Sequence, residues 1–229
     1  DIINRILSER TGLIDSRNID VFRGNFDYIN SLRLSSEEVY DDILLEVFHE
    51  SISGSIIHIE SLKGADGEIR LRLGENKPFG LINVGDASKL IKLCRENELN
   101  TSDVDFSKSL FADINSKNSP INILIGSKKF TEGWNSWRVS TMGLMNIGRT
   151  EGSQIIQLFG RGVRLKGRDF SLKRSNAYFK DHPFVKSPDN YIYMRYLETL
   201  NIFGLRADYM MQFKEYLEAE GINPDEEKT

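Results

Sequence analysis

The chain has 229 residues, and its 39% hydrophobic, 28% charged and 10% aromatic side chains are typical of a globular protein. Its formal net charge is −4 at pH 7, it contains one cysteine, and no apolar run approaches the ~20 residues of a membrane span. These features argue against a membrane span and exclude an internal disulfide framework, and three scattered histidines argue against a zinc site. We therefore expect a cytoplasmic protein without a membrane partner.

The charge is uneven along the chain. The net charge is −7 over residues 1–120, +7 over residues 121–174 and −4 over residues 175–229. A basic block of this kind can bind phosphates although the whole chain is acidic, because such contacts depend on the potential within about 10 Å, one Debye length. The alternative is that the block is an ordinary solvent-exposed surface. The motifs inside the block distinguish phosphate binding from this alternative.

The first predicted elements are a helix and a β-hairpin. Ser35 and Glu38 have the spacing of a capping box, and the apolar residues that follow fall on one face of a helix that ends near residue 50. Two strands then flank an Asp-Gly turn that is typical of hairpins, residues 55–62 and 69–73. In the second strand Arg70 and Arg72 alternate with apolar residues. They either contact DNA or a partner subunit, or form the outer face of a small sheet.

From residue 78 onward the pattern changes to alternating strands and helices. Apolar runs predict strands at residues 79–84, 121–125, 141–145 and 197–203. Helices are predicted at residues 87–96, 106–114, 151–158 and 207–220, with mostly loop at 168–192. Strands that alternate with helices of this length are typical of a parallel sheet with crossover helices, so the expected fold class is α/β.

The eleven residues 154–164 carry the clearest chemical signal. At 100° per residue they form a helix with one apolar side, made of Ile155, Ile156, Phe159 and Val163. The opposite side is polar and consists of Gln154, Gln157, Arg161 and Arg164. Such a helix can aim two guanidinium groups at one anion, because the planar fork of arginine binds phosphate oxygens bidentately and stays charged. Two glycines inside the helix argue against the alternative of an ordinary surface helix.

The order Gln-x-x-Gly-Arg-x-x-Arg in this stretch resembles the sixth motif of superfamily 2 helicases and translocases. The resemblance implies that Arg161 and Arg164 are catalytic and reach the γ-phosphate of ATP, one of them as an arginine finger. It also implies ATP contacts for Gln157 and Gly160. Removal of such a finger typically lowers the rate of phosphoryl transfer by about 10³–10⁵.

Upstream, the apolar strand at residues 121–125 runs into a polar loop that contains a glycine, and this segment resembles the fifth motif of the same superfamily. The resemblance implies nucleic-acid contacts for Ser127, Lys128, Lys129 and Thr131, and ATP contacts for Glu132, Gly133 and Asn135. Asn135 stands where the family usually has Asp, so it can hydrogen-bond a ribose hydroxyl but lacks the negative charge. Solvent exposure explains the two lysines equally well, and packing is the favoured role of Trp134 and Trp137.

Together the two motifs resemble most closely the helicase subunit of type III restriction enzymes and related DEAD/DEAH-box restriction helicases. The finer match lies in residues 131–134 and 157–165, Thr-Glu-Gly-Trp and Gln-Leu-Phe-Gly-Arg-Gly-Val-Arg-Leu. The resemblance implies a RecA-like second helicase domain over residues 78–166. An N-terminal helical segment and β-hairpin insertion, residues 1–77, would precede it, and a C-terminal α/β extension, residues 167–229, would follow.

A motor of this superfamily closes its ATP site between two RecA-like domains, and the first domain brings a G-x-x-x-x-G-K-[S/T] loop and an acidic box for Mg²⁺. The sequence contains neither, and it does not begin with Met. We therefore expect the second half of a motor from a longer polypeptide, inactive by itself. The implied cofactors are ATP and Mg²⁺. The implied partners are the N-terminal RecA-like domain of the same polypeptide, DNA, and a modification or nuclease subunit.

The expected function is that of the second motor domain of an ATP-dependent DNA helicase or translocase in a restriction or phage-defence system. The alternative is a non-catalytic module that binds nucleic acid or protein and keeps a helicase-like fold. A nuclease is disfavoured, because no Asp…Glu-x-Lys cluster follows a strand in the sequence.

Overall fold

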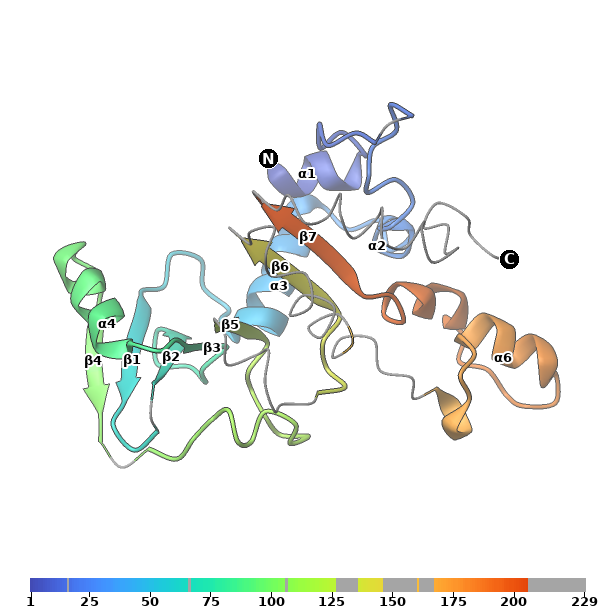
Figure 1. Cartoon of the computed structure of the whole chain (residues 1–229). Coiled ribbons are helices and arrows are strands. Elements are labelled where there is room, and N and C mark those ends of the chain that lie inside the picture. The colour runs from blue at the N-terminus through green and yellow to red at the C-terminus, as the bar shows by residue number, and fades with distance from the viewer. Residues whose placement is uncertain are drawn as a thin grey trace. The chain divides into compact units, whose positions relative to one another are not determined.

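The computed structural model describes residues 1–15, 17–65, 67–105, 107–126, 136–145, 160 and 167–205. The described residues form both helices and strands, so the fold is mixed α/β, in agreement with the expected class (Figure 1). The chain divides into two compact units, residues 1–129 and 130–229. The three-part organisation with boundaries after residues 77 and 166 stays a prediction.

The described part of the first unit contains helices and one sheet. Its helices are α1 (Ile2–Leu7), α2 (Asp27–Ser31), α3 (Ser36–Phe48) and α4 (Ala87–Glu96). Its strands are β1 (Ile57–Leu62), β2 (Glu68–Leu73), β3 (Gly80–Asn83), β4 (Thr101–Val104) and β5 (Ile123–Gly126). The predicted helices at 35–50 and 87–96, the predicted hairpin, and the predicted strands at 79–84 and 121–125 are therefore confirmed.

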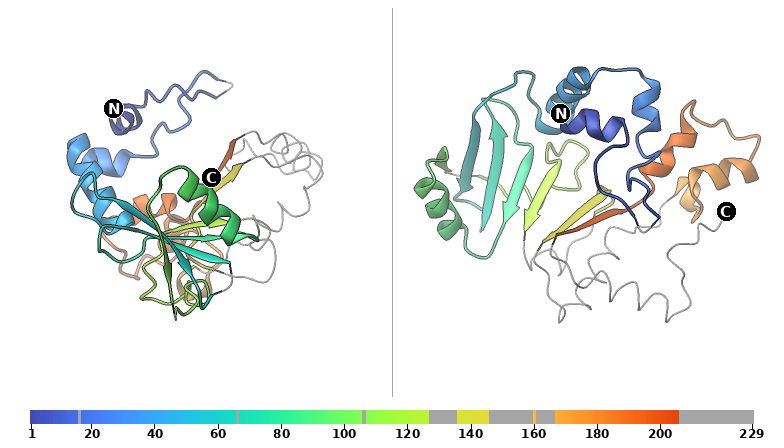
Figure 2. Two further views of the ribbon diagram at one scale, coloured as in Figure 1. Left: turned by 90° about the vertical axis from the view of Figure 1, so that its left-hand side faces the viewer. Right: turned by 90° about the horizontal axis from the view of Figure 1, so that it is seen from above.

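The five strands form one sheet in the order β4-β1-β2-β3-β5. β1 is parallel to β4 and β3 is parallel to β5, whereas β2 is antiparallel to both of its neighbours. Four strands of this sheet thus point the same way, and β2 is reversed (Figure 2). The hairpin of β1 and β2 lies in the middle of the sheet, because β2 pairs directly with β3. The sheet departs from the expected parallel arrangement at β2.

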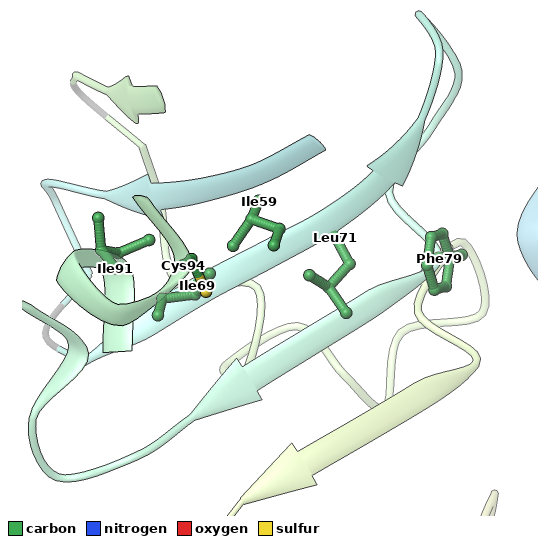
Figure 3. Close-up of a cluster of buried hydrophobic side chains, with 6 residues drawn as sticks. All are labelled: Ile59, Ile69, Leu71, Phe79, Ile91 and Cys94. Atoms are coloured by element: carbon green, nitrogen blue, oxygen red, sulfur yellow. The ribbon is translucent and has the colours of Figure 1, made fainter. Parts of the chain in front are cut away.

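One face of this sheet is apolar and is covered by α4. Ile59 of β1 and Ile69 and Leu71 of β2 lie on this face, as the alternation of side chains in their register requires. Ile91 and Cys94 of α4 pack against them, and all five side chains are buried (Figure 3). Burial of an aliphatic side chain of this size contributes about 1.5–3 kcal/mol to stability, so this contact holds α4 on the sheet.

The helix α3 has the capping box that the sequence predicts. Ser35 Oγ accepts a hydrogen bond from the Glu38 N–H at 3.2 Å, and the Glu38 carboxylate accepts one from the Ser35 N–H at 2.7 Å. At its other end, His49 takes a left-handed conformation and its Nε2 lies 2.6 Å from the carbonyl oxygen of Pro120. The Asn122 side-chain amide donates to two carbonyl oxygens of the last turn. These bonds fasten α3 to the segment before β5.

The helix expected at residues 106–114 is wrong, because residues 107–109 are irregular and residues 110–114 form turns. The buried carboxylate of Glu68 accepts hydrogen bonds from the N–H groups of Leu110 (2.8 Å) and Phe111 (3.3 Å) and from the Ser109 hydroxyl. In a helix these two N–H groups would bond the carbonyl oxygens four residues earlier. A contact from a distant strand therefore replaces the local helix. The edge strand β4 was not predicted either, because its Thr-Ser-Asp-Val sequence is polar.

The described part of the second unit contains the two-stranded parallel sheet of β6 (Thr141–Met145) and β7 (Asn201–Leu205). Its helices are η3 (Arg168–Phe170), α6 (Ser175–Asp181) and η4 (Tyr191–Tyr196). The strand at 141–145 is confirmed, and the last strand begins four residues later than expected. The expected loop at 168–192 is wrong where α6 forms. The helices expected at 151–158 and 207–220 lie outside the described residues.

Gly64 in the turn of the β1–β2 hairpin offers a test of this packing. A Cβ atom added there would lie 2.2 Å from the backbone oxygen of Ser107, so the backbone would have to move. We predict that Gly64→Ala lowers the free energy of unfolding by about 1–3 kcal/mol, the usual cost of overpacking, in urea titrations followed by circular dichroism.

Gly85 provides the matched control, because a Cβ atom added at Gly85 meets no atom within 4 Å. Gly85→Ala should leave the unfolding midpoint unchanged or slightly raised, since alanine restricts the unfolded chain. Equal midpoints for Gly64→Ala and the wild type would contradict the close approach of the hairpin turn to residue 107.

Candidate functional site

The residues assigned from the two helicase-like motifs fall almost entirely outside the described part of the chain. Those outside it are Ser127, Lys128, Lys129, Thr131, Glu132, Gly133, Asn135, Gln157, Arg161 and Arg164. Gly160 is described and exposed, and a Cβ atom added to it would meet no atom within 4 Å. The roles implied for all eleven residues stay predictions.

The structure does define the sheet edge from which the fifth-motif segment continues. β3 and β5 are parallel neighbours that end at the same level, with Asn83 paired to Gly126. Ser127 is the next residue in the sequence. In open α/β sheets, ligands bind beyond the carboxyl ends of parallel strands, where the loops that follow the strands gather. The carboxyl ends of β3 and β5 are therefore the candidate functional edge.

Asn83 lies at the base of this edge. The residue is 2% exposed, and its Nδ2 atom has no hydrogen-bond partner in the structure as described. A Cβ atom added to Gly67 would lie 3.6 Å from Asn83 Oδ1, so the amide is next to the turn of the β1–β2 hairpin. A buried donor without a partner costs about 1–3 kcal/mol. The edge thus contains a polar group whose hydrogen-bonding capacity is not used.

The start of α4 lies directly after β3 and bears on what this edge can bind. Asp86 caps the helix, because its side chain accepts a hydrogen bond from the Lys89 N–H at 2.9 Å. A carboxylate at a helix N-terminus already satisfies the partial positive charge there. This helix start by itself is therefore not an anion site.

The opposite face of the sheet holds a buried ion cluster. The Glu60 carboxylate, which is 4% exposed, accepts hydrogen bonds from Arg70 Nε and from Arg72 Nε, the latter at 3.0 Å. Arg72 also donates to the carbonyl oxygen of Gly74 and lies 3.4 Å from Glu75. The register explains the cluster, because Glu60 stands opposite Arg70 and Arg72 is the next residue on the same face.

The cluster determines the charge states of its members. Burial by itself would raise the pKa of the Glu60 carboxyl, but the hydrogen bonds and positive charges of Arg70 and Arg72 hold that pKa below its ordinary value of 4.5. Burial acts to lower the pKa of Arg72, whereas Glu60 and Glu75 raise it, and the net direction is upward. Both arginines are therefore bound to Glu60, which favours a structural role for them over a contact with DNA.

Sequence reasoning missed Glu60 and Asn83. Glu60 could have been found, because the hairpin turn sets the register and a carboxylate opposite two arginines is a stabilising cross-strand pair. Nothing in the sequence distinguishes Asn83, which occupies the last position of an apolar strand. Its importance depends on burial, which only the fold reveals.

Two further properties bear on the site. In the ranges that the structure describes, no group of three or more His, Cys, Asp or Glu side chains is placed to hold a metal ion. No helix in the same ranges has the length and apolar character needed to cross a bilayer.

No protein-family model, curated protein or solved structure matches the chain. The function is therefore argued from the residues and their arrangement.

The ion cluster can be tested by Glu60→Gln. Loss of the carboxylate leaves Arg70 without its counter-charge and Arg72 with only the exposed Glu75, so we predict a loss of about 2 kcal/mol in the free energy of unfolding at pH 7. This is below the 3–5 kcal/mol of fully buried pairs because Arg70 is 27% exposed and water screens it. Urea titration provides the measurement, and Glu75→Gln is the control, since Glu75 is 91% exposed.

The contribution of Glu60 to stability should depend on pH. Because the folded-state pKa of Glu60 lies below 4.5, its contribution to stability is complete above that pH and is lost as the pH falls through the folded-state value. The difference in stability between the wild type and Glu60→Gln should therefore shrink on acidification. A difference that stays constant from pH 7 down to acid unfolding would contradict the ion cluster.

Proposed function

We propose that the chain is the second motor domain of an ATP-dependent DNA helicase or translocase that serves a restriction or phage-defence system. In this proposal it works with a first RecA-like motor domain, joined in the same polypeptide, which binds most of the ATP. Closing and opening of the two domains would move the protein along DNA. The RecA-like character of the fold is part of the proposal.

The observation that carries the proposal is the position of β5. This strand ends at Gly126, beside the end of β3, and the polar fifth-motif run begins with the next residue in the sequence. A nucleotide or a phosphate bound by that run would then lie where α/β sheets usually bind ligands. The unused donor of Asn83 at the same edge is consistent with this assignment.

The distribution of charge gives further support. Glu60 neutralises the hairpin arginines in part, whereas residues 121–174 carry ten basic and only three acidic side chains. This excess coincides with the two motifs. It provides the local positive potential that phosphate contacts need in a chain with a net charge of −4.

The residues proposed to act fall into two groups. Arg161 and Arg164 would stabilise the negative charge that develops on the phosphoryl oxygens during transfer. A guanidinium group suits this role because its planar donors are directional and its charge is permanent. Ser127 and the two lysines that follow it would hold the phosphates of one strand. We assign Mg²⁺ to the first motor domain, because in the superfamily that the motifs resemble the acidic box for Mg²⁺ belongs to that domain.

The decisive test is Arg164→Ala in the polypeptide that joins this chain to its first motor domain. We predict that DNA-stimulated ATP hydrolysis falls by a factor of about 10³ or more, because an arginine finger contributes 10³–10⁵ to the rate. Arg17→Ala is the control, since Arg17 is 78% exposed and pairs only with the nearby Asp15 among the described residues. Turnover of Arg164→Ala at the wild-type rate would refute the assignment.

The same assay separates the proposal from the alternative of a non-catalytic binding module. A motor requires turnover that rises with added DNA and disappears when the finger is removed. A binding module would show no turnover in the wild type, with or without DNA. Comparison of double-stranded DNA, single-stranded DNA and RNA in this assay identifies the nucleic acid that stimulates it.

A further inference from the structure

The segment 167–186 of the second unit, which neither motif includes, combines aromatic and basic side chains. It carries five basic residues, Arg168, Lys173, Arg174, Lys180 and Lys186, against the two acidic residues Asp169 and Asp181. It also carries two strongly exposed aromatic rings, since Phe170 is 81% and Phe184 is 101% exposed. Single exposed apolar side chains are ordinary on a protein surface, but exposed aromatic rings within a basic segment are the combination that binds single-stranded nucleic acid.

The two parts of this segment are fastened to each other. Arg168 Nη1 donates to the carbonyl oxygen of Lys186 at 3.4 Å, and its guanidinium lies 5.6 Å from the ring centre of Phe179. The Tyr178 hydroxyl donates to Asp169 at 2.6 Å. Because Arg168 and Asp169 directly precede Phe170, the turn that carries this ring is tied to the part of the segment that carries Phe184.

The backbone of this turn is strained. Asp169 and Phe170 both have positive φ angles, 54° and 60°, which non-glycine residues seldom adopt. A side chain in this conformation is unfavourable because its Cβ atom crowds the following carbonyl oxygen, and the ring of Phe170, which is 81% exposed, gains little packing in return. Strain of this kind is concentrated at sites that bind ligands.

Three of the basic side chains have their charge available. Arg174, Lys180 and Lys186 are exposed, and none of them forms an ion pair within the described ranges. Lys173, by contrast, pairs with Asp181. The segment therefore presents a net charge of +3 together with two uncovered rings.

We propose that segment 167–186 is a binding surface for single-stranded nucleic acid, with Phe170 and Phe184 as stacking platforms and the free basic side chains as phosphate contacts. Aromatic rings stack on unpaired bases, whereas the bases of a duplex are already stacked on each other. The positive charge complements the phosphate backbone. Binding at this surface requires neither ATP nor the motif residues, so a test of this proposal does not depend on the motor assignment.

The test is fluorescence anisotropy of the whole 229-residue chain with labelled oligothymidine of about 16 nucleotides, the upper end of known site sizes. The wild type should bind this strand more tightly than a duplex of equal length. Phe184→Ala should weaken binding by roughly five- to a hundredfold, the value of one base–aromatic stack. Lys186→Gln should lower the slope of log affinity against log salt by about 0.7.

Matched variants separate stacking from folding. Leu172→Ala removes a strongly exposed aliphatic side chain, 72% exposed, from the same segment and should leave affinity unchanged, and Phe184→Trp should retain it. Phe170→Gly removes a ring but suits a positive φ, so it should raise the melting temperature while it weakens binding. A residue with a purely structural role would not separate these two effects.

Three results would overturn the proposal. The first is equal affinity of the wild type for the single strand and the duplex. The second is wild-type affinity in both Phe184→Ala and Phe170→Gly. The third is binding of a poly-glutamate peptide that is lost in Phe184→Ala while oligothymidine binding persists, since the surface would then serve an acidic protein partner.

Discussion

The carboxylate of Glu60 fixes the register on which the first unit depends. It binds both arginines of β2, which hold the hairpin with Glu60 opposite Arg70. A shift by one residue would turn both arginines toward the apolar face under α4 and leave their charges without a partner. Because the hairpin lies in the middle of the sheet, its register also determines how β3 and β4 are placed on either side.

The candidate functional edge follows from this register. β2 positions β3, β3 positions β5, and the two parallel strands end together at Asn83 and Gly126. The buried charges of Glu60, Arg70 and Arg72 thus serve the construction of the sheet, and the phosphate contacts that we propose fall to the separate basic block of residues 121–174. The acidic total of the chain is therefore compatible with two separate regions that bind nucleic acid, one proposed at the motifs and one at segment 167–186.

The elements that were predicted correctly are those that interactions between residues close in the sequence determine. The capping box of Ser35 identified α3, and the Asp-Gly turn identified the hairpin. The predictions failed where contacts between residues far apart in the sequence determine the local structure. Glu68 accepts hydrogen bonds from the backbone N–H groups of residues 110 and 111, and β4 is a strand because it pairs with β1. Of the motif residues, the structure describes Gly160, so the roles that the resemblance implies for these residues stay predictions, and the structure adds the position of the strand that precedes the fifth-motif run.

The pairing of β3 with β5 has a consequence for the order in which the protein assembles. β1, β2 and β3 follow one another through short connections, whereas Gly80 pairs with Ile123, which is separated from it by α4, β4 and a long turn region. Contacts between distant residues form more slowly than local ones, because the intervening loop must close first. The three-stranded meander can therefore form while the chain is still being synthesised. The candidate functional edge exists only after residue 126 has been added and β5 has paired with β3.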